Sequence, residues 1–203
     1  NIDIACAPPV LHLDYVYKKE LESNDKIILS LNNECESLLK YIKTIDYNFD
    51  INYMKDFTEF EDHNKFLEGT GSMVLDRENK ICYAAISVRT DEQAVLQWCD
   101  VFDYTPVCFT ANQDVDGERM EIYHTNVMMC IADKYAIVCL DTIDDREERK
   151  WMKGSLEGSG KEIIEITEEQ KHRFAGNMLQ LMGDEKYLVM SKSAFESLTE
   201  SQI

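Results

Sequence analysis

Paired apolar segments recur along the chain at intervals of about fifty residues. The three pairs cover residues 72–86, 126–140 and 177–191, and a short charged turn separates the two halves of each pair. Every half lacks proline and is almost continuously apolar, which is typical of strands buried on both faces. The pattern therefore predicts three β-hairpins that belong to an internal repeat.

Helical segments and single strands fill the intervals between the hairpins. Residues 91–99 open with acids suited to a helix N-terminus, and residues 105–110 return as a strand. Residues 144–152 predict a second helix that ends at Gly154 or near Gly158, and residues 162–166 predict a second strand. Recurring ββαβ units bury their faces against neighbouring units, so the sequence predicts an α/β fold of stacked modules.

The remaining segments complete the predicted order. Thr167 and Gln170 have the spacing of a capping box at the start of a short helix. Residues 34–42 have helical spacing, and residues 51–54 look extended. Residues 1–31 are expected to form a strand and loop at an edge, or a poorly ordered tail.

The length of 203 residues is sufficient for one hydrophobic core. We therefore expect a single domain spanning residues 1–203, with modules near residues 34–110, 111–166 and 167–203.

The net charge of −18, from 39 acidic and 21 basic residues, excludes several classes of partner. The basic residues do not form a run, so nucleic acid is not expected as a partner, and an anionic membrane surface is disfavoured. An acidic field would instead raise the local concentration of a small cation. No signal peptide and no apolar stretch of the ~18 residues that a membrane span needs is recognisable, so we expect a cytoplasmic protein.

The cysteines and histidines do not have the spacing of a metal site. There are seven cysteines without a CxxC pair, and Cys82, Cys130 and Cys139 lie inside apolar runs, as expected of reduced core residues. Three of the histidines, at positions 12, 63 and 172, do not have ligand spacing either. Because nucleotide and haem motifs are also lacking, no cofactor is expected.

Three short segments carry the candidate chemistry, at residues 66–76 (FLEGTGSMVLD), 87–90 (SVRT) and 123–129 (YHTNVMM). They supply a carboxylate, Glu68, beside a glycine-flanked strand. They also supply an arginine after the next strand and a histidine at the matching place one unit later. These groups are suited to holding and protonating a planar guanidinium group.

The residues alone favour structural roles for all three groups. Glu68 has the surroundings of a carboxylate in a turn. His124 follows a strand-like segment at residues 120–123, and a histidine at a strand end is more often a hydrogen-bonded polar residue than a catalytic one. Arg89 has the surroundings of a solvated surface arginine near the start of a helix. The repeat adds one expectation: because Asn126 aligns with Ser72 across the hairpins, Glu68 and His124 should lie close together at one end of the modules.

The three segments resemble those of the guanidino-group-modifying (pentein) superfamily of arginine deiminases, dimethylarginine dimethylaminohydrolases and amidinotransferases. The resemblance extends from about Asp46 to Ile203. Within the superfamily, the sequence most resembles a bacterial branch that is amidinotransferase-like, or arginine-deiminase-related. It implies a propeller of five α/β modules, here expected to be incomplete. It also implies a small-molecule guanidino substrate, arginine or an N-substituted arginine, that is converted to citrulline without a cofactor.

The resemblance also assigns roles to individual residues. Glu68 would orient the substrate guanidinium and the imidazole of His124. His124 would protonate the leaving amine and then activate water, and Arg89 would bind the substrate α-carboxylate with its planar fork. Thr70 and Asn126 would line the substrate site. Deiminases carry an aspartate where this chain has Asn126, so the guanidinium clamp would be one charge weaker.

The nucleophile is the part of the mechanism that the sequence does not supply. Enzymes of this superfamily attack the guanidinium carbon with a cysteine in a glycine-rich segment beyond the equivalent of residues 194–198, and no such segment precedes Ile203. An early Pro-Asp or Asn-Asp motif likewise has no convincing copy in residues 1–47. We therefore expect the nucleophilic cysteine outside this chain.

Three hypotheses stay open from the sequence. The first is a guanidino hydrolase or amidinotransferase. The second is a binding or regulatory relative that kept substrate recognition but lost catalysis. The third is a partial propeller that needs a partner chain or a second copy, as in a homo-oligomer, to cover its sheet edges.

Overall fold

The computed structural model describes residues 57–203 of the chain, which divides into two compact units, Asn1–Lys65 and Phe66–Ile203. The described part of the first unit contains the 3-10 helix η1 (Thr58–His63). The rings of Phe57 and Phe60 stack at its start, with centroids 6.5 Å apart. The helix predicted at residues 34–42, the strand at 51–54 and the terminal segment 1–31 lie outside the described residues. The single-domain assignment stays a prediction.

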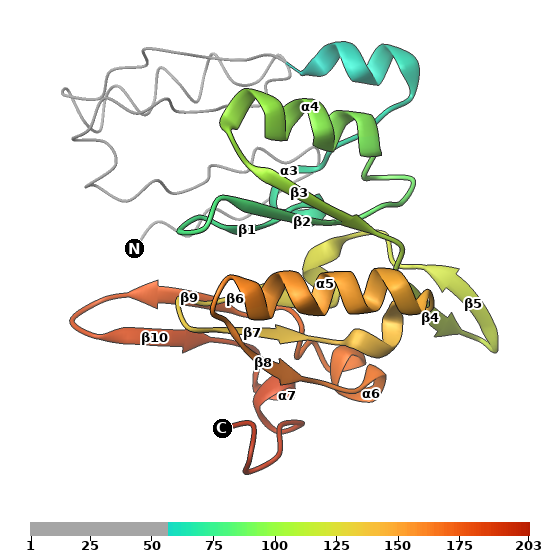
Figure 1. Ribbon diagram of the computed structural model, residues 1–203. Helices are drawn as coiled ribbons and strands as arrows, with labels where there is room; N and C mark the ends of the chain where they lie inside the picture. The colour runs from blue at the N-terminus through green and yellow to red at the C-terminus, as the bar shows by residue number, and fades with distance from the viewer. Residues whose placement is uncertain (1–56) are drawn as a thin grey trace, which may run out of the picture. The chain divides into compact units, whose positions relative to one another are not determined.

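The second unit opens with one complete ββαβ module (Figure 1). Strands β1 (Val74–Asp76) and β2 (Ile81–Ala85) form an antiparallel hairpin, and β3 (Thr105–Phe109) pairs parallel to β2. Helix α4 (Glu92–Phe102) connects β2 to β3, and the side chain of Asp91 caps it by accepting the N–H of Ala94 at 3.1 Å. The predicted helix and strand are both present.

A second module repeats this topology. Strands β6 (Met129–Ile131) and β7 (Tyr135–Val138) are antiparallel, and β8 (Glu162–Glu165) pairs parallel to β7 after helix α5 (Arg146–Gly158). Asp145 caps α5 by accepting the N–H groups of the second and third residues of the helix. The predicted repeat and the mixed α/β class are therefore confirmed.

The first strands of both hairpins begin later than predicted. Residues Gly69–Ser72 form the short helix α3, and Thr125–Val127 form the 3-10 helix η2. The prediction that residues 72 and 126 start strands is therefore wrong. The side chains of Ser72 and Thr125 make tertiary hydrogen bonds that favour these compact turns, as described below.

A further hairpin lies between the two modules. It consists of β4 (Asn112–Val115) and β5 (Glu118–Glu121), whereas the sequence indicated only an extended segment at residues 120–123. Its turn residues Asp116 and Gly117 have φ values of 52° and 86°, as tight hairpin turns require.

Arg119 fixes this exposed hairpin to the rest of the unit. Its guanidinium donates to Asp144 and to Glu168, each at 2.7 Å. The hydrogen bond with Asp144, followed by that with Glu168, raises the pKa of Arg119, so its charge is permanent. The arginine therefore links β5 to the loop before α5 and to α6 (Glu168–His172).

The third hairpin consists of β9 (Leu179–Met182) and β10 (Lys186–Val189) and is followed by the short helix α7 (Lys192–Phe195). Most of its side chains are exposed, so the prediction that all three hairpins are buried on both faces is wrong here. Within residues 57–203 this sheet has two strands and no third strand pairs with β10. The preceding helix α6 has the predicted capping box of Thr167 and Gln170.

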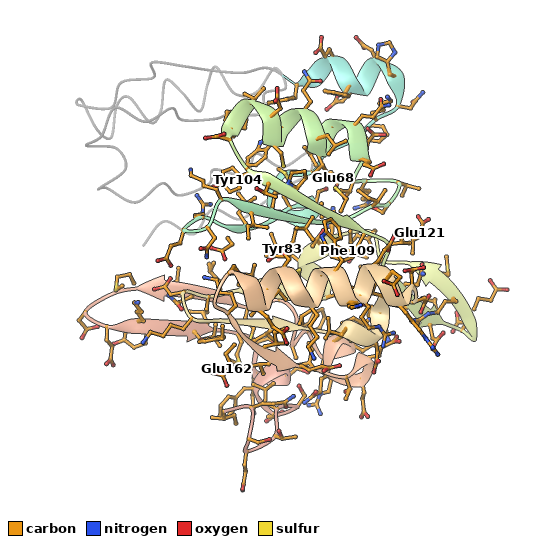
Figure 2. The ribbon with its side chains drawn as sticks, viewed as in Figure 1. Glu68, Tyr83, Tyr104, Phe109, Glu121 and Glu162 are labelled. Carbon is orange, nitrogen blue, oxygen red and sulfur yellow. The ribbon has the colours of Figure 1, made fainter. Side chains whose placement is uncertain are left out.

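The hydrophobic core lies around α5, which contacts both β8 of its own module and β3 of the preceding one (Figure 1). Met152 and Leu156 of this helix are fully buried. Figure 2 shows Tyr83 and Phe109 between the first sheet and α5, and the hydroxyl of Tyr83 lies 3.1 Å from that of Ser155. Burial of each such side chain contributes about 1.5–3 kcal/mol. None of the helices in the described range is long and apolar enough to cross a membrane.

A buried ion pair joins the two modules at the end where the hairpin turns lie. The amine of Lys161, before β8, lies 3.3 Å from a carboxylate oxygen of Asp76 and donates to the carbonyl of Asp133 at 2.8 Å. Both charged side chains are almost inaccessible, with 3% and 1% of their surfaces exposed. Asp76 also accepts two hydrogen bonds from Asn79. Each charge therefore depends on the other to offset its desolvation.

We expect Lys161→Met to lower the free energy of unfolding by about 3–5 kcal/mol, because it leaves Asp76 as an uncompensated buried charge. Urea denaturation followed by circular dichroism measures this change. The control is Lys192→Met, since Lys192 pairs with Glu196 on an exposed surface and its loss should change stability by less than about 1 kcal/mol. Adding Asp76→Asn to Lys161→Met should recover part of the loss. Equal stabilities of the two single variants would contradict the assignment.

Candidate functional site

The three sequence-predicted groups meet at the end of the modules opposite the hairpin turns. Glu68 precedes α3 and β1, Arg89 follows β2, and His124 precedes η2 and β6. The Nε2 atom of His124 lies 2.5 Å from Oε2 of Glu68, and Nη1 of Arg89 lies 3.7 Å from the same oxygen. The expected proximity of Glu68 and His124 is therefore observed, and Arg89 joins them.

The site is open to solvent to different degrees at its three groups. The side chain of His124 is 19% exposed, whereas those of Glu68 and Arg89 are 42% and 51% exposed. The imidazole is thus held within the protein, while a ligand can reach both the carboxylate and the guanidinium. The ring of Tyr123 lies beside both Arg89 and His124, with its centroid 5.3 Å from the Arg89 guanidinium carbon and 4.9 Å from the imidazole centroid.

Gly71 sets the position of the imidazole. A Cβ atom at this residue would lie 2.9 Å from Cε1 of His124 and 3.0 Å from two further ring atoms. Any side chain at this position would therefore force the ring away from Glu68. The absence of a side chain at Gly71 thus leaves room for the His124 ring next to Glu68.

The buried hydroxyl of Ser72 connects the segments that carry Glu68 and Arg89. It accepts the backbone N–H of Glu68 at 2.9 Å and donates to the backbone carbonyl of Arg89 at 2.9 Å. Ser72 is fully buried, so both hydrogen bonds are shielded from water. One side chain thus fixes the separation of the carboxylate and the guanidinium.

Thr125 connects this pair to the histidine. Its hydroxyl donates to the carbonyl of Ser72 at 2.5 Å and accepts the N–H of Ala85 at 2.8 Å, and it is also fully buried. Neither Ser72 nor Thr125 was singled out from the sequence. The available signal was that each is a hydroxyl residue at the boundary between a candidate motif and an apolar strand.

Thr70 and Asn126 occupy comparable places. Thr70 lies in α3 two residues after Glu68, and Asn126 lies in η2 two residues after His124. The two short helices contact each other, and both side chains are partly accessible. The positions are compatible with lining a ligand, and their roles stay predictions.

The cysteines of residues 57–203 are all buried or partly buried. Cys82, Cys99, Cys130 and Cys139 are buried, and Cys108 is partly buried. Burial raises the pKa of Cys108 to about 12 and those of Cys130 and Cys139 to about 11. A hydrogen bond with Cys82 lowers the pKa of Cys99, and Cys99 is only 1% exposed. In residues 57–203, no group of three or more potential ligand side chains is placed to hold a metal ion.

Solved structures share this fold. The apo structure of ArgZ, an arginine dihydrolase from the ornithine-ammonia cycle in cyanobacteria, matches with a TM-score of 0.56 at 16% identity, over 87% of this chain and 27% of ArgZ. The substrate-bound N-terminal domain of ArgZ, a cysteine-to-serine variant, matches with a TM-score of 0.55 at 16% identity, over 87% of this chain and 61% of that domain. A cysteine-to-alanine variant of AgrE in complex with L-arginine matches with a TM-score of 0.52 at 18% identity, over 76% of this chain and 22% of AgrE.

The chain thus spans less than two thirds of the length of each of these proteins, and at such identities the likeness concerns the fold. No individual curated protein matches the sequence. The family model described as N,N dimethylarginine dimethylhydrolase, eukaryotic, matches residues 19–203. This match confirms the superfamily expected from the three motifs. The chain belongs to the eukaryotic N,N dimethylarginine dimethylhydrolase family.

Proposed function

We propose that this chain carries the substrate-binding and proton-transfer groups of a hydrolase that converts arginine or an N-substituted arginine to citrulline. The observation that carries the proposal is the 2.5 Å contact between His124 and Glu68, with Arg89 3.7 Å from the same carboxylate oxygen. The family match and the arginine dihydrolase neighbours support a guanidino substrate. They favour hydrolysis over amidino transfer, because the proteins they name are hydrolases.

Glu68 is suited to bind the guanidinium of the substrate. Within the described part of the chain, its contacts with His124 and Arg89 both involve Oε2, which leaves Oε1 to accept a substrate N–H. A carboxylate that accepts from a guanidinium forms a short, charge-assisted hydrogen bond. Thr70 and Asn126 would contact the same ligand from α3 and η2.

His124 is suited to transfer protons, because its ring nitrogen contacts the Glu68 carboxylate, which orients the imidazole, while the ring stays largely shielded. A thiolate would attack the guanidinium carbon, and the C–N bond to the leaving amine would break as His124 supplies the proton. His124 would then take a proton from water, which attacks the amidino thioester. This step releases citrulline and restores the thiolate.

The thiolate would come from a cysteine outside residues 57–203, because the described cysteines are buried or hold their protons at neutral pH. The arginine-bound and substrate-bound neighbours carry a replaced cysteine, which agrees with thiol attack in those proteins. Arg89 would bind the α-carboxylate of the amino acid, since its planar fork is exposed and can form two parallel hydrogen bonds.

The finer architecture is also a proposal. The two ββαβ modules, the third hairpin and the likeness to arginine dihydrolases support a pentein-type propeller of five modules. In such a propeller the open edge of β10 would receive a parallel strand, as β2 and β7 do. The alternative, a binding or regulatory relative without catalysis, differs from the enzyme in turnover rather than in ligand recognition.

We expect Arg89→Ala to weaken the binding of arginine or citrulline by about 1.5–3 kcal/mol, because a charge-assisted pair with the α-carboxylate is lost. Isothermal titration calorimetry measures the change. The matched control is Arg173→Ala, because Arg173 also lies 3.7 Å from a carboxylate oxygen, that of Glu196, and is similarly exposed at 44%. Unchanged affinity in Arg89→Ala would reject Arg89 as the carboxylate anchor.

We expect the five described cysteines to resist iodoacetamide at pH 8 in the folded protein. A thiol with a pKa of about 11 is ionised in about one molecule per thousand at that pH, and the thiolate is the reactive form. Cys82 and Cys99 are protected by burial instead. Peptide mapping by mass spectrometry should detect labelling only after urea is added. Rapid labelling of one of the five in the native protein would make that residue the nucleophile.

In a form of the protein that produces citrulline, Gly71→Ala should reduce kcat by about 10²–10⁴-fold, as His124→Ala should, because the added methyl group displaces the proton-transfer imidazole. Colorimetric detection of citrulline measures the rate. The control is Gly154→Ala, since a Cβ at that position meets no atom within 4 Å. Normal turnover in Gly71→Ala would show that the position of the ring next to Glu68 is not needed for catalysis.

A further inference from the structure

A positively charged groove runs along helix α5. Its volume is about 440 Å³, and it is lined by Leu140, Arg146, Arg149, Lys150, Lys153 and Glu165. The four cations follow one another at intervals of three, one and three residues, which places them on one face of the helix. The groove therefore has a cationic helix wall, and the only acid in its lining is Glu165.

This concentration of positive charge opposes the overall charge of the protein. The chain has 21 basic residues against 39 acidic ones, yet four basic side chains line a single groove. An ordinary solvated helix face would alternate acids and bases at intervals of three or four residues, because such pairs are favourable and like charges repel. The four residues of α5 that line the groove are all basic, and the acids nearest to two of them, Asp141 and Glu157, lie outside the lining.

The position of one of these cations, Arg146, at the start of the helix is also unfavourable for local stability. Asp145, Glu147 and Glu148 complement the positive end of the helix dipole in the first turn, but Arg146 lies in the same turn with the opposite sign. Helix formation alone would not favour a cation there. A bound anion in the groove would offset this repulsion.

The four cations differ in how they are held. Arg149 is fixed, because its Nε donates to the carbonyl of Ile143 at 2.8 Å and its Nη1 to Asp141 at 3.2 Å. Lys153 lies 4.0 Å from Glu157 on the same helix. Arg146 and Lys150 form no ion pair with any residue in the 57–203 range. Two cations are therefore free to bind an anion beside a pre-positioned guanidinium.

We propose that this groove binds a small molecule that carries two or more adjacent phosphate groups. Guanidinium forks and amines together are suited to bind phosphate oxygens. The volume is within the range of small-ligand pockets, about 300–1,000 Å³. A long polyanion such as RNA would extend from the groove onto an acidic protein surface, so a compact ligand is favoured. Glu165 would accept a hydroxyl or amine hydrogen from the rest of the ligand.

The test is calorimetric titration of the full chain with inorganic tripolyphosphate at about 50 mM salt, where screening is weak. Arg146→Ala combined with Lys150→Ala should raise Kd by about tenfold or more, since two exposed charge contacts are lost. Lys192→Ala is the control, because Lys192 is 87% exposed on α7. The Kd of Lys192→Ala for tripolyphosphate should equal that of the unaltered protein. Glu165→Gln should bind tripolyphosphate as tightly or more tightly.

A nucleoside triphosphate and citrate extend the test. Tighter binding of the nucleotide than of tripolyphosphate, lost in the double variant, would support the proposal and show that the groove also contacts the nucleoside. Equal binding of citrate would overturn the phosphate assignment. The proposal also fails if tripolyphosphate gives no heat, if the double variant binds normally, or if Lys192→Ala weakens binding equally, because the attraction would then be diffuse.

Discussion

The hydrogen bond between the Thr125 hydroxyl and the Ser72 carbonyl is the contact on which the candidate site depends. Glu68 and Arg89 belong to the first module, and His124 precedes the second. The distances between the three groups therefore depend on how the two modules are held together. Both hydroxyl residues are fully buried, and an unpaired polar group there would cost about 1–3 kcal/mol. The modules therefore cannot shift at this end without breaking bonds that water does not replace.

The two ends of the modules use ion pairs for different purposes. Lys161 and Asp76 are almost completely removed from solvent, so neither can exchange its partner for a ligand. Glu68 and Arg89 are about half exposed and lie 3.7 Å apart, a separation at which each can bind another group at little cost. Burial, rather than residue type, thus separates the structural pair from the pair that is available for binding.

Local signals in the sequence predicted much of the fold. The hairpins and helices of the two modules followed from apolar patterning, and the capping box of Thr167 followed from residue spacing, because these features depend on near neighbours, whereas the polar β4–β5 hairpin was not predicted. The repeat also predicted that Glu68 and His124 would be close. The short helices around Ser72 and Thr125, the contact of Gly71 with the imidazole ring and the exposure of β9 and β10 could not be predicted in this way. Each depends on what another part of the chain places beside it.

The β4–β5 hairpin has a practical consequence for engineering. Its backbone turns at Asp116 and Gly117, whose neighbours are exposed, while Arg119 fixes the hairpin to Asp144 and Glu168. Exposed loop tips with small or polar residues are where chains accept added sequence most readily. A short epitope or a fluorophore attachment site introduced between these two turn residues would therefore report on the protein without disturbing either module.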